Sequence, residues 1–164
     1  IAHSLENEDL TLYRRFGYGT SAFSEGWALY AERLALEVGL AENPYDELGI
    51  LQSELFRSVR LVVDTGMHYK RWTREEAMDY MKSITGMSDT EVRVEIERYI
   101  VWPGQALSYK VGMIKMLELR EKAKQELGDQ FNIKDFHSAV LDHGNPPLFI
   151  VEKMIDKMIS DAKS

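Results

Sequence analysis

The chain has 164 residues, which is enough for one ordinary domain with a sizeable hydrophobic core. Its net charge of −7, with both signs interspersed, argues against a nucleic-acid partner, because binding to a phosphate backbone depends on clustered lysines and arginines. It has no cysteine, which excludes a disulfide framework, a thiolate zinc site and a cysteine nucleophile in these residues, and leaves the cell envelope, the periplasm and the cytoplasm open as locations.

The chain starts with Ile1 rather than methionine, and its first five residues have the character of a continuing helix. We therefore expect it to be a piece of a longer protein, whose signal peptide or lipid anchor would lie before Ile1. No apolar run approaches the roughly 20 residues that cross a bilayer, so we expect no transmembrane segment here.

The first strong helical pattern begins near Phe23, and its predicted buried stripe is Phe23, Trp27, Ala31, Leu34 and Val38. Glu25 lies about 200° round the helix from Trp27, so it cannot share this stripe. Its small neighbours Ser24 and Gly26 leave room beside the carboxylate for another group. A purely structural role also stays open, because a carboxylate in the first turn is favoured by the helix dipole by ~0.3–1 kcal/mol.

A long helix is predicted from Asn43, as N-cap, through Pro44 to about Tyr69. Its apolar residues recur at helical spacing, and the predicted buried stripe is Leu48, Leu51, Leu55, Val59 and Val62.

Arg60, Asp64 and His68 follow at intervals of four on an adjacent face of this helix. The spacing lets Asp64 pair with Arg60 and also reach His68, which would fix the imidazole tautomer. Two interpretations stay open: the three residues contact substrate or support a metal site, or they form an ordinary ion-pair ladder within one helix.

Two capping boxes, Thr73 with Glu76 and Ser88 with Glu91, predict short helices near residues 74–84 and 89–101. We interpret this helix pair as scaffold without chemistry of its own.

A Trp-Pro-Gly sequence then interrupts the chain, and Pro103 is expected to open a helix that runs to about Leu127. The residues predicted to face inward are Leu107, Val111, Ile114 and Leu117. Gln105 and Tyr109 share a face one turn apart. From the pattern alone Tyr109 needs no catalytic role, because half-buried tyrosines commonly keep the hydroxyl at the surface.

Two further helices are predicted, one with Phe136, Val140 and Leu141 inward and a last one with Ile150, Met154 and Met158 inward. His137 and His143 are six residues apart, which does not place them on one helical face, so we interpret both as structural or solvent-facing. No run of alternating β-branched residues predicts a strand. The predicted fold class is all-α, a helical bundle with residues 1–164 as a single domain, expected to be the C-terminal half of a larger helical domain.

Three motifs resemble one known family. They are Glu-Gly-Trp-Ala-Leu-Tyr-Ala-Glu at 25–32, Arg-Leu-Val-Val-Asp-Thr-Gly-Met-His at 60–68 and Tyr-Ile-Val-Trp-Pro-Gly-Gln-Ala-Leu-Ser-Tyr-Lys at 99–110. In this order they resemble the C-terminal part of the bacterial domain-of-unknown-function (DUF) 885 family. That family is similar to gluzincin metallopeptidases, in which a His-Glu-x-x-His helix gives two zinc ligands and a downstream glutamate gives the third.

The resemblance implies that Glu25 is the third zinc ligand of an intact parent protein that cleaves a peptide or a small amide. It implies that Tyr109, with Tyr99 as second candidate, stabilises the oxyanion. The residues expected to contact substrate or support the metal ligands are Arg60, Asp64, His68, Gln105 and Tyr99. The His-Glu-x-x-His motif is absent from this sequence and is expected just before Ile1. We therefore expect the chain alone to bind no zinc and to be inactive.

Two alternatives remain. The whole protein is a non-catalytic helical binding module that keeps a peptidase-like scaffold, or the chain self-associates, because a divided domain exposes core-facing helices.

Overall fold

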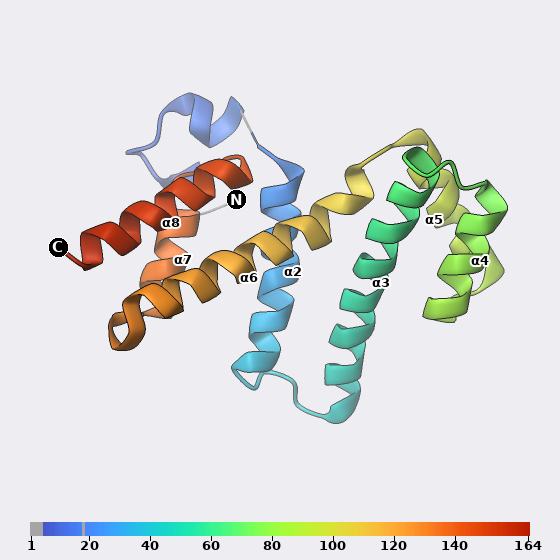
Figure 1. Ribbon diagram of the computed structural model, residues 1–164, viewed down its shortest axis with the longest axis horizontal. Helices are drawn as coiled ribbons and strands as arrows, with labels where there is room; N and C mark the ends of the chain where they lie inside the picture. Colours follow the sequence, from blue (N-terminus) through green and yellow to red (C-terminus); the bar gives the residue numbers. More distant parts are fainter. Residues whose placement is uncertain (1–4, 18) are drawn as a thin grey trace. The chain divides into compact units, whose positions relative to one another are not determined.

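A computed structural model of the chain describes residues 5–17 and 19–164, and the described residues contain helices and no strand (Figure 1). This confirms the all-α fold class. The α-helices are α2 (Ser21–Glu37), α3 (Pro44–His68), α4 (Arg74–Thr85), α5 (Asp89–Val101), α6 (Ser108–Leu127), α7 (Ile133–Leu141) and α8 (Leu148–Ala162). Three short elements complete them, a π-helix η1 (Tyr13–Gly17) and the 3₁₀-helices η2 (Gln105–Leu107) and η3 (Gly128–Gln130). No described helix is long and apolar enough to cross a membrane.

The chain divides into two compact units, unit 1 with residues 1–27 and 112–164 and unit 2 with residues 28–111. The boundaries fall inside α2 and α6, so each of these helices contributes to both units. That residues 1–164 form a single domain stays a prediction.

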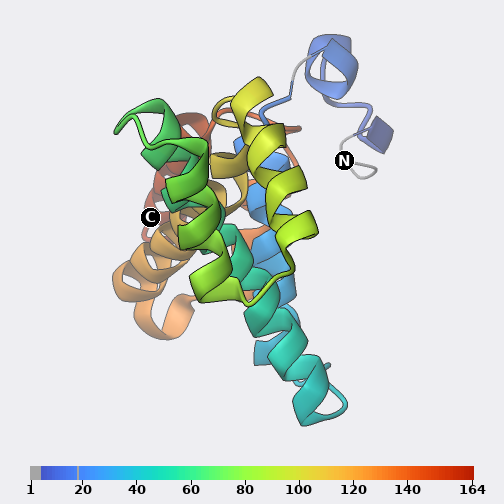
Figure 2. The ribbon, with the colours of Figure 1, turned by 90° about the vertical axis from the view of Figure 1, so that its right-hand side faces the viewer.

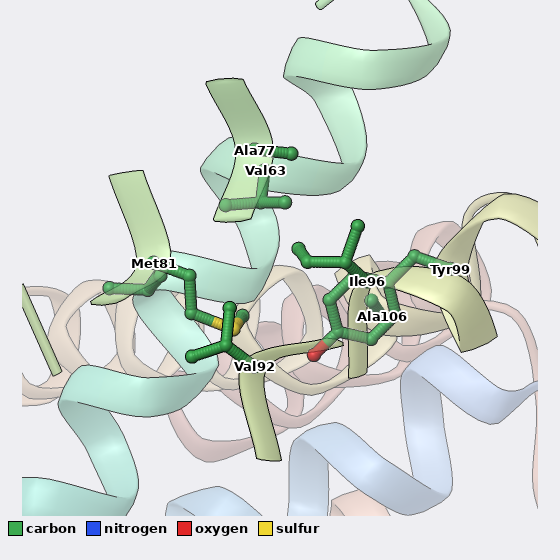
Figure 3. Close-up of a cluster of buried hydrophobic side chains, with 8 residues drawn as sticks. Val63, Ala77, Met81, Val92, Ile96, Tyr99 and Ala106 are labelled. Carbon is green, nitrogen blue, oxygen red and sulfur yellow. The ribbon is translucent and has the colours of Figure 1, made fainter. Parts of the chain in front are cut away.

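Unit 2 is organised around α3, which packs against α4, α5 and η2, while α4 and α5 lie side by side (Figure 2). Its core draws on all four elements and consists of Val59, Val63, Ala77, Met81, Val92, Ile96, Tyr99 and Ala106 (Figure 3). All eight side chains are at most 3% exposed. This core fixes the positions of α3, α5 and η2, from which most of the candidate site residues come.

Capping explains where the helices of unit 2 begin. The Asn43 side chain accepts hydrogen bonds from the backbone of Tyr45 and Asp46, and Pro44 follows as the first helical residue. Both predicted capping boxes are present, at the starts of α4 and α5. The hydrogen bonds of these boxes hold the pKa values of Glu76 and Glu91 below the usual glutamate range.

In unit 1, α2 and α6 approach each other at two glycines. A Cβ atom built on Gly26 would lie 2.4 Å from the Gly112 Cα, and one built on Gly112 would lie 1.9 Å from the Ala22 carbonyl oxygen. Any larger side chain at either position would force the two backbones apart. The small size of Gly26 is therefore explained by this helix contact.

The remaining core of unit 1 comes from α6, α7 and α8, of which α7 packs against α8. Its buried side chains are Met113, Met116, Leu119, Ala123, Phe136, Val140, Val151, Ile155 and Ile159. His137 of α7 is half-buried and meets Trp27 edge-on, with ring centroids 5.3 Å apart, as its structural interpretation expects. Burial, with a smaller contribution from Arg120, lowers the pKa of His137.

Several predicted buried stripes are wrong. In α3 only Val59 is buried as predicted, whereas Leu48 is 51% exposed and Leu55 is 43% exposed. The buried face instead consists of Val59, Arg60, Val63, Asp64 and Gly66. Hydrophobic spacing predicted the wrong face because two charged residues, Arg60 and Asp64, lie on the buried one.

The stripes of the other long helices are displaced in a similar way. In α2 the buried residues are Phe23, Gly26, Leu29 and Tyr30, while Val38 is 62% exposed. In α6 the exposed residues include Val111 and Ile114, and the buried face consists of Gly112, Met113, Met116, Leu119 and Ala123. In α8 the buried row lies one position after the predicted one. Pro103 does not open a helix, because Gly104 adopts φ 80° and α6 begins only after η2.

Candidate functional site

Arg60 and Asp64 of α3 are two buried charged residues of unit 2. Most of the predicted site residues of this unit lie around them. Arg60 and Asp64 lie one turn apart and are 3% and 2% exposed. Charged groups are rarely buried to this extent without specific partners, since removing them from water is costly. Their partners come from α5, η2 and the start of α6.

The Arg60 guanidinium lies among three aromatic rings. Its Cζ is 4.8 Å from the ring centroid of Tyr109, 5.3 Å from that of Tyr99 and 5.5 Å from that of Phe56. Its Nη2 donates to Gln105 Oε1 at 3.2 Å. Its Nε is buried and has no hydrogen-bond partner in the described part of the chain. Cation–π contacts rather than a carboxylate therefore hold this charge in place.

The Asp64 carboxylate accepts the backbone N–H of Gly104, with 3.2 Å to Oδ1 and 3.0 Å to Oδ2. Burial raises the pKa of Asp64, and this effect exceeds the opposite effects of the Gly104 amide, His68 and Arg60. Asp64 thus fixes the turn before η2.

The ion-pair ladder, one of the two interpretations left open for Arg60, Asp64 and His68, is not formed in the structure. Asp64 bonds the Gly104 amide, Arg60 bonds Gln105, and His68 Nε2 lies 3.0 Å from the Tyr99 carbonyl oxygen. Since a carbonyl oxygen can only accept, Nε2 carries the hydrogen of His68. The hydrogen bond to Tyr99 of α5, and not an interaction with Asp64, therefore sets the His68 tautomer. All three residues of this row bind groups from outside α3.

Gln105 and Tyr99 complete the surroundings of Arg60. Gln105 Oε1 accepts from Arg98 Nη2 at 3.3 Å as well as from Arg60. The Tyr99 hydroxyl donates to Glu95 Oε2 at 2.5 Å. Burial and this hydrogen bond raise the pKa of Tyr99 far above its usual value. The Tyr99 proton is therefore committed to Glu95.

Tyr109, at the start of α6, is half-buried. Guanidinium groups of Arg60 and Arg57 lie 4.8 Å and 5.5 Å from its ring centroid. Its hydroxyl makes no hydrogen bond to any other described residue. Tyr109 therefore offers a free hydrogen-bond donor beside two positive charges.

Arg57 belongs to this cluster and was missed by the sequence analysis. Its Nη1 donates to Ser53 Oγ at 3.0 Å, and its Cζ lies 5.4 Å from the Phe56 ring centroid. Its Nε is buried without a partner, like that of Arg60. The spacing of three residues from Arg60 on a helix was the signal that could have identified it.

Glu25 lies in unit 1, on α2, and is half-buried. Gly26 beside it is packed on Gly112, which fixes this turn of the helix. No three or more His, Cys, Asp or Glu side chains form a group that could hold a metal ion among residues 5–17 and 19–164. The role of Glu25 as a zinc ligand stays a prediction.

The fold and the cluster define an all-α protein whose unit 2 holds a pair of buried or half-buried arginines between aromatic rings. Residues 1–155 match the family described as "Bacterial protein of unknown function (DUF885)", and the chain belongs to this family. A comparison with curated protein sequences found no match.

Two solved structures are similar to the chain. One is a "putative lipoprotein" from Colwellia psychrerythraea, with 50% sequence identity and a TM-score of 0.92 over 98% of this chain and 27% of that one. The other is a "putative lipoprotein of unknown function" from Shewanella oneidensis, with 28% identity and a TM-score of 0.85 over 92% of this chain and 28% of that one. The chain thus spans little more than a quarter of the length of either relative.

Proposed function

We propose that the chain is part of a zinc-dependent peptidase or amide hydrolase in which Tyr109 stabilises the oxyanion formed at the scissile carbonyl. The observation that carries this proposal is the Tyr109 hydroxyl, which has no partner among the described residues and lies on a ring flanked by Arg57 and Arg60. A donor fixed beside positive charge stabilises a developing negative charge more strongly than water does.

Tyr109 is a better candidate for this role than Tyr99. The Tyr99 side chain is 1% exposed and its hydroxyl already donates to Glu95, so it cannot meet a substrate oxygen without breaking that bond. Tyr109 has no such bond to lose. Three further residues have positioning roles in this proposal. Arg60, held by Gln105, contacts the ring of Tyr109, and Asp64 fixes the turn at Gly104 that precedes it.

Glu25 is the contribution of this chain to the proposed zinc site, and the remaining ligands would come from outside the described residues. The length of the two solved relatives supports a parent protein larger than this chain. Their descriptions as lipoproteins support a location in the cell envelope for that parent.

The test uses the full-length protein that contains this chain. Zinc content and hydrolysis of a peptide library are measured for the wild type, Glu25→Gln and Tyr109→Phe, with Tyr45→Phe as control because Tyr45 is 84% exposed. We expect Glu25→Gln to lose zinc and activity together. Tyr109→Phe should keep zinc and lose about 10²–10³ in kcat, the usual loss when one oxyanion donor is removed.

Each result discriminates between the alternatives. A wild type that holds no zinc and cleaves no peptide would favour the binding module. Tyr109→Phe with unchanged kcat would remove Tyr109 from the mechanism and leave the hydrolase class standing.

A further inference from the structure

The acidic residues near Tyr109 already have partners. Glu54 accepts from Lys110 at 2.6 Å and from Arg33 at 3.4 Å, and these cations lower its pKa although burial acts in the opposite direction. Glu95 bonds the Tyr99 hydroxyl. Glu32 also lies close to Arg57, because it accepts from the Ser53 hydroxyl at 2.8 Å and the same hydroxyl oxygen accepts from Arg57 Nη1. Among the described residues, none of these carboxylates forms an ion pair with Arg57.

Arg57 and Arg60 remain without an ion pair in the described ranges. Each has a buried Nε that makes no hydrogen bond there. A buried hydrogen-bond donor that has no acceptor destabilises a protein by about 1–3 kcal/mol, and by more when the group is charged. Arg57 thus carries a positive charge without an ion pair, three residues from a second guanidinium, and this favours the approach of an anion.

The two guanidiniums differ in access. Arg60 is 3% exposed and is held by three aromatic rings and Gln105. It therefore adds positive charge to the site without contacting a ligand directly. Arg57 is half-buried and lies 5.5 Å from the Tyr109 ring centroid, so it is the more accessible of the two arginines. A planar guanidinium presents parallel N–H groups that match the two oxygens of a carboxylate.

A cavity lies beside Phe56. The Phe56 ring, which both guanidiniums contact, lines this cavity of about 300 Å³. Leu55 and Met87 add to its apolar wall, and Gln52, Thr85 and Gly86 complete the lining. A ligand bound at Arg57 therefore has an apolar space nearby for an aliphatic side chain.

We infer that Arg57, backed by Arg60, binds the free C-terminal carboxylate of a peptide whose last residue is aliphatic. The inference rests on the hydrolase proposed above and names its substrate class, a peptide cleaved near its C-terminus. Arg57 is then a specificity-determining residue, since it binds the part of the substrate that does not react.

The experiment separates binding from hydrolysis. Calorimetry on the full-length protein, made metal-free with a chelator, measures binding of acetyl-Ala-Ala-Leu and of its C-terminal amide. Acetyl-Ala-Glu-Leu amide distinguishes a side-chain carboxylate from a terminal one. The same peptides are then offered to the untreated protein, and kcat and KM are determined.

We expect the acid to bind at least about tenfold more tightly than the amide, which corresponds to one charge-assisted interaction. Arg57→Gln should abolish this preference and raise KM with little change in kcat, and Arg57→Lys should restore part of it. Arg93→Gln, which removes the same charge from an exposed position of α5, should behave as wild type.

Two results would overturn the inference: equal binding of acid and amide, or a preference that survives in Arg57→Gln. Binding of the glutamate-containing amide as tightly as the acid would also count against it. If the acid preference depends on Arg57 but no peptide is cleaved, the carboxylate site stands and the hydrolase fails. If peptides are cleaved without regard to the terminal charge, the hydrolase stands and the carboxylate site fails.

Discussion

Asp64 is a buried carboxylate whose hydrogen bond goes to a backbone amide 40 residues further along the chain. The Gly104 N–H and the nearby charge of Arg60 favour its ionised form, yet desolvation is the larger effect and raises its pKa. The folded state therefore holds a proton on Asp64 more tightly than the unfolded state does. Its contribution to stability must then fall as pH rises from the ordinary aspartate pKa through the raised one.

The variant Asp64→Asn tests the direction of this pH dependence. Its amide keeps an oxygen that can accept from the Gly104 N–H, and it cannot ionise. We expect the stability of the wild type relative to Asp64→Asn to increase as pH is lowered from neutral towards the ordinary aspartate pKa of 3.8. Urea unfolding of both proteins at several pH values measures it. The opposite slope would show that the Gly104 amide and Arg60 outweigh desolvation.

At the scale of residues, the sequence indicated several of the side chains that cluster around Arg60 but not their contacts. The interval of four residues predicted that Arg60, Asp64 and His68 lie on one side of α3. In the structure, Arg60 also contacts Gln105 and Tyr109. The partners could not be predicted, because they lie 31 to 45 residues away and depend on how α5 and η2 pack.

At the scale of helices, local signals were sufficient where backbone groups must be satisfied within a few residues. The capping boxes predicted α4 and α5, and Asn43 with Pro44 predicted the start of α3. The buried faces were predicted less well, since hydrophobic spacing ignores glycine. On α2 and α6 the closest contact is made by Gly26 and Gly112, which no such pattern identifies.

Gly112→Ala tests that contact. The new Cβ would lie 1.9 Å from the Ala22 carbonyl oxygen, so we expect a net loss of about 1–3 kcal/mol in the free energy of unfolding, despite the better helix propensity of alanine. The matched control is Gly49→Ala in α3, where nothing lies within 4 Å of the added atom. It should stabilise the protein by about 0.5–1 kcal/mol. Equal effects in thermal or urea unfolding would contradict the contact.

At the scale of the whole molecule, α3 carries an exposed apolar row, Leu48, Leu51, Leu55 and Val62, each 39–51% exposed. Self-association of the chain stays a prediction, and this row is where we expect it to occur, because exposed apolar surface is removed from water on contact.

Light scattering of the 164-residue chain over a range of concentrations measures this association. Leu51→Lys with Leu55→Lys should shift the chain towards monomer, whereas Val94→Lys on α5, where Val94 is 58% exposed, should not. A wild-type chain that stays monomeric at every concentration would contradict the prediction.

Tyr99 takes part in several interactions at once. Its ring packs in the core of unit 2 and against Arg60, its hydroxyl bonds Glu95, and its carbonyl oxygen accepts from His68. A substitution there would disturb all of them together, although no substrate need touch it. If Tyr109 acts as proposed, a random-mutagenesis screen scored by activity alone would rank Tyr99 beside it. Only a parallel measurement of folded protein in each mutant would separate the architectural tyrosine from the one that we propose as the oxyanion donor.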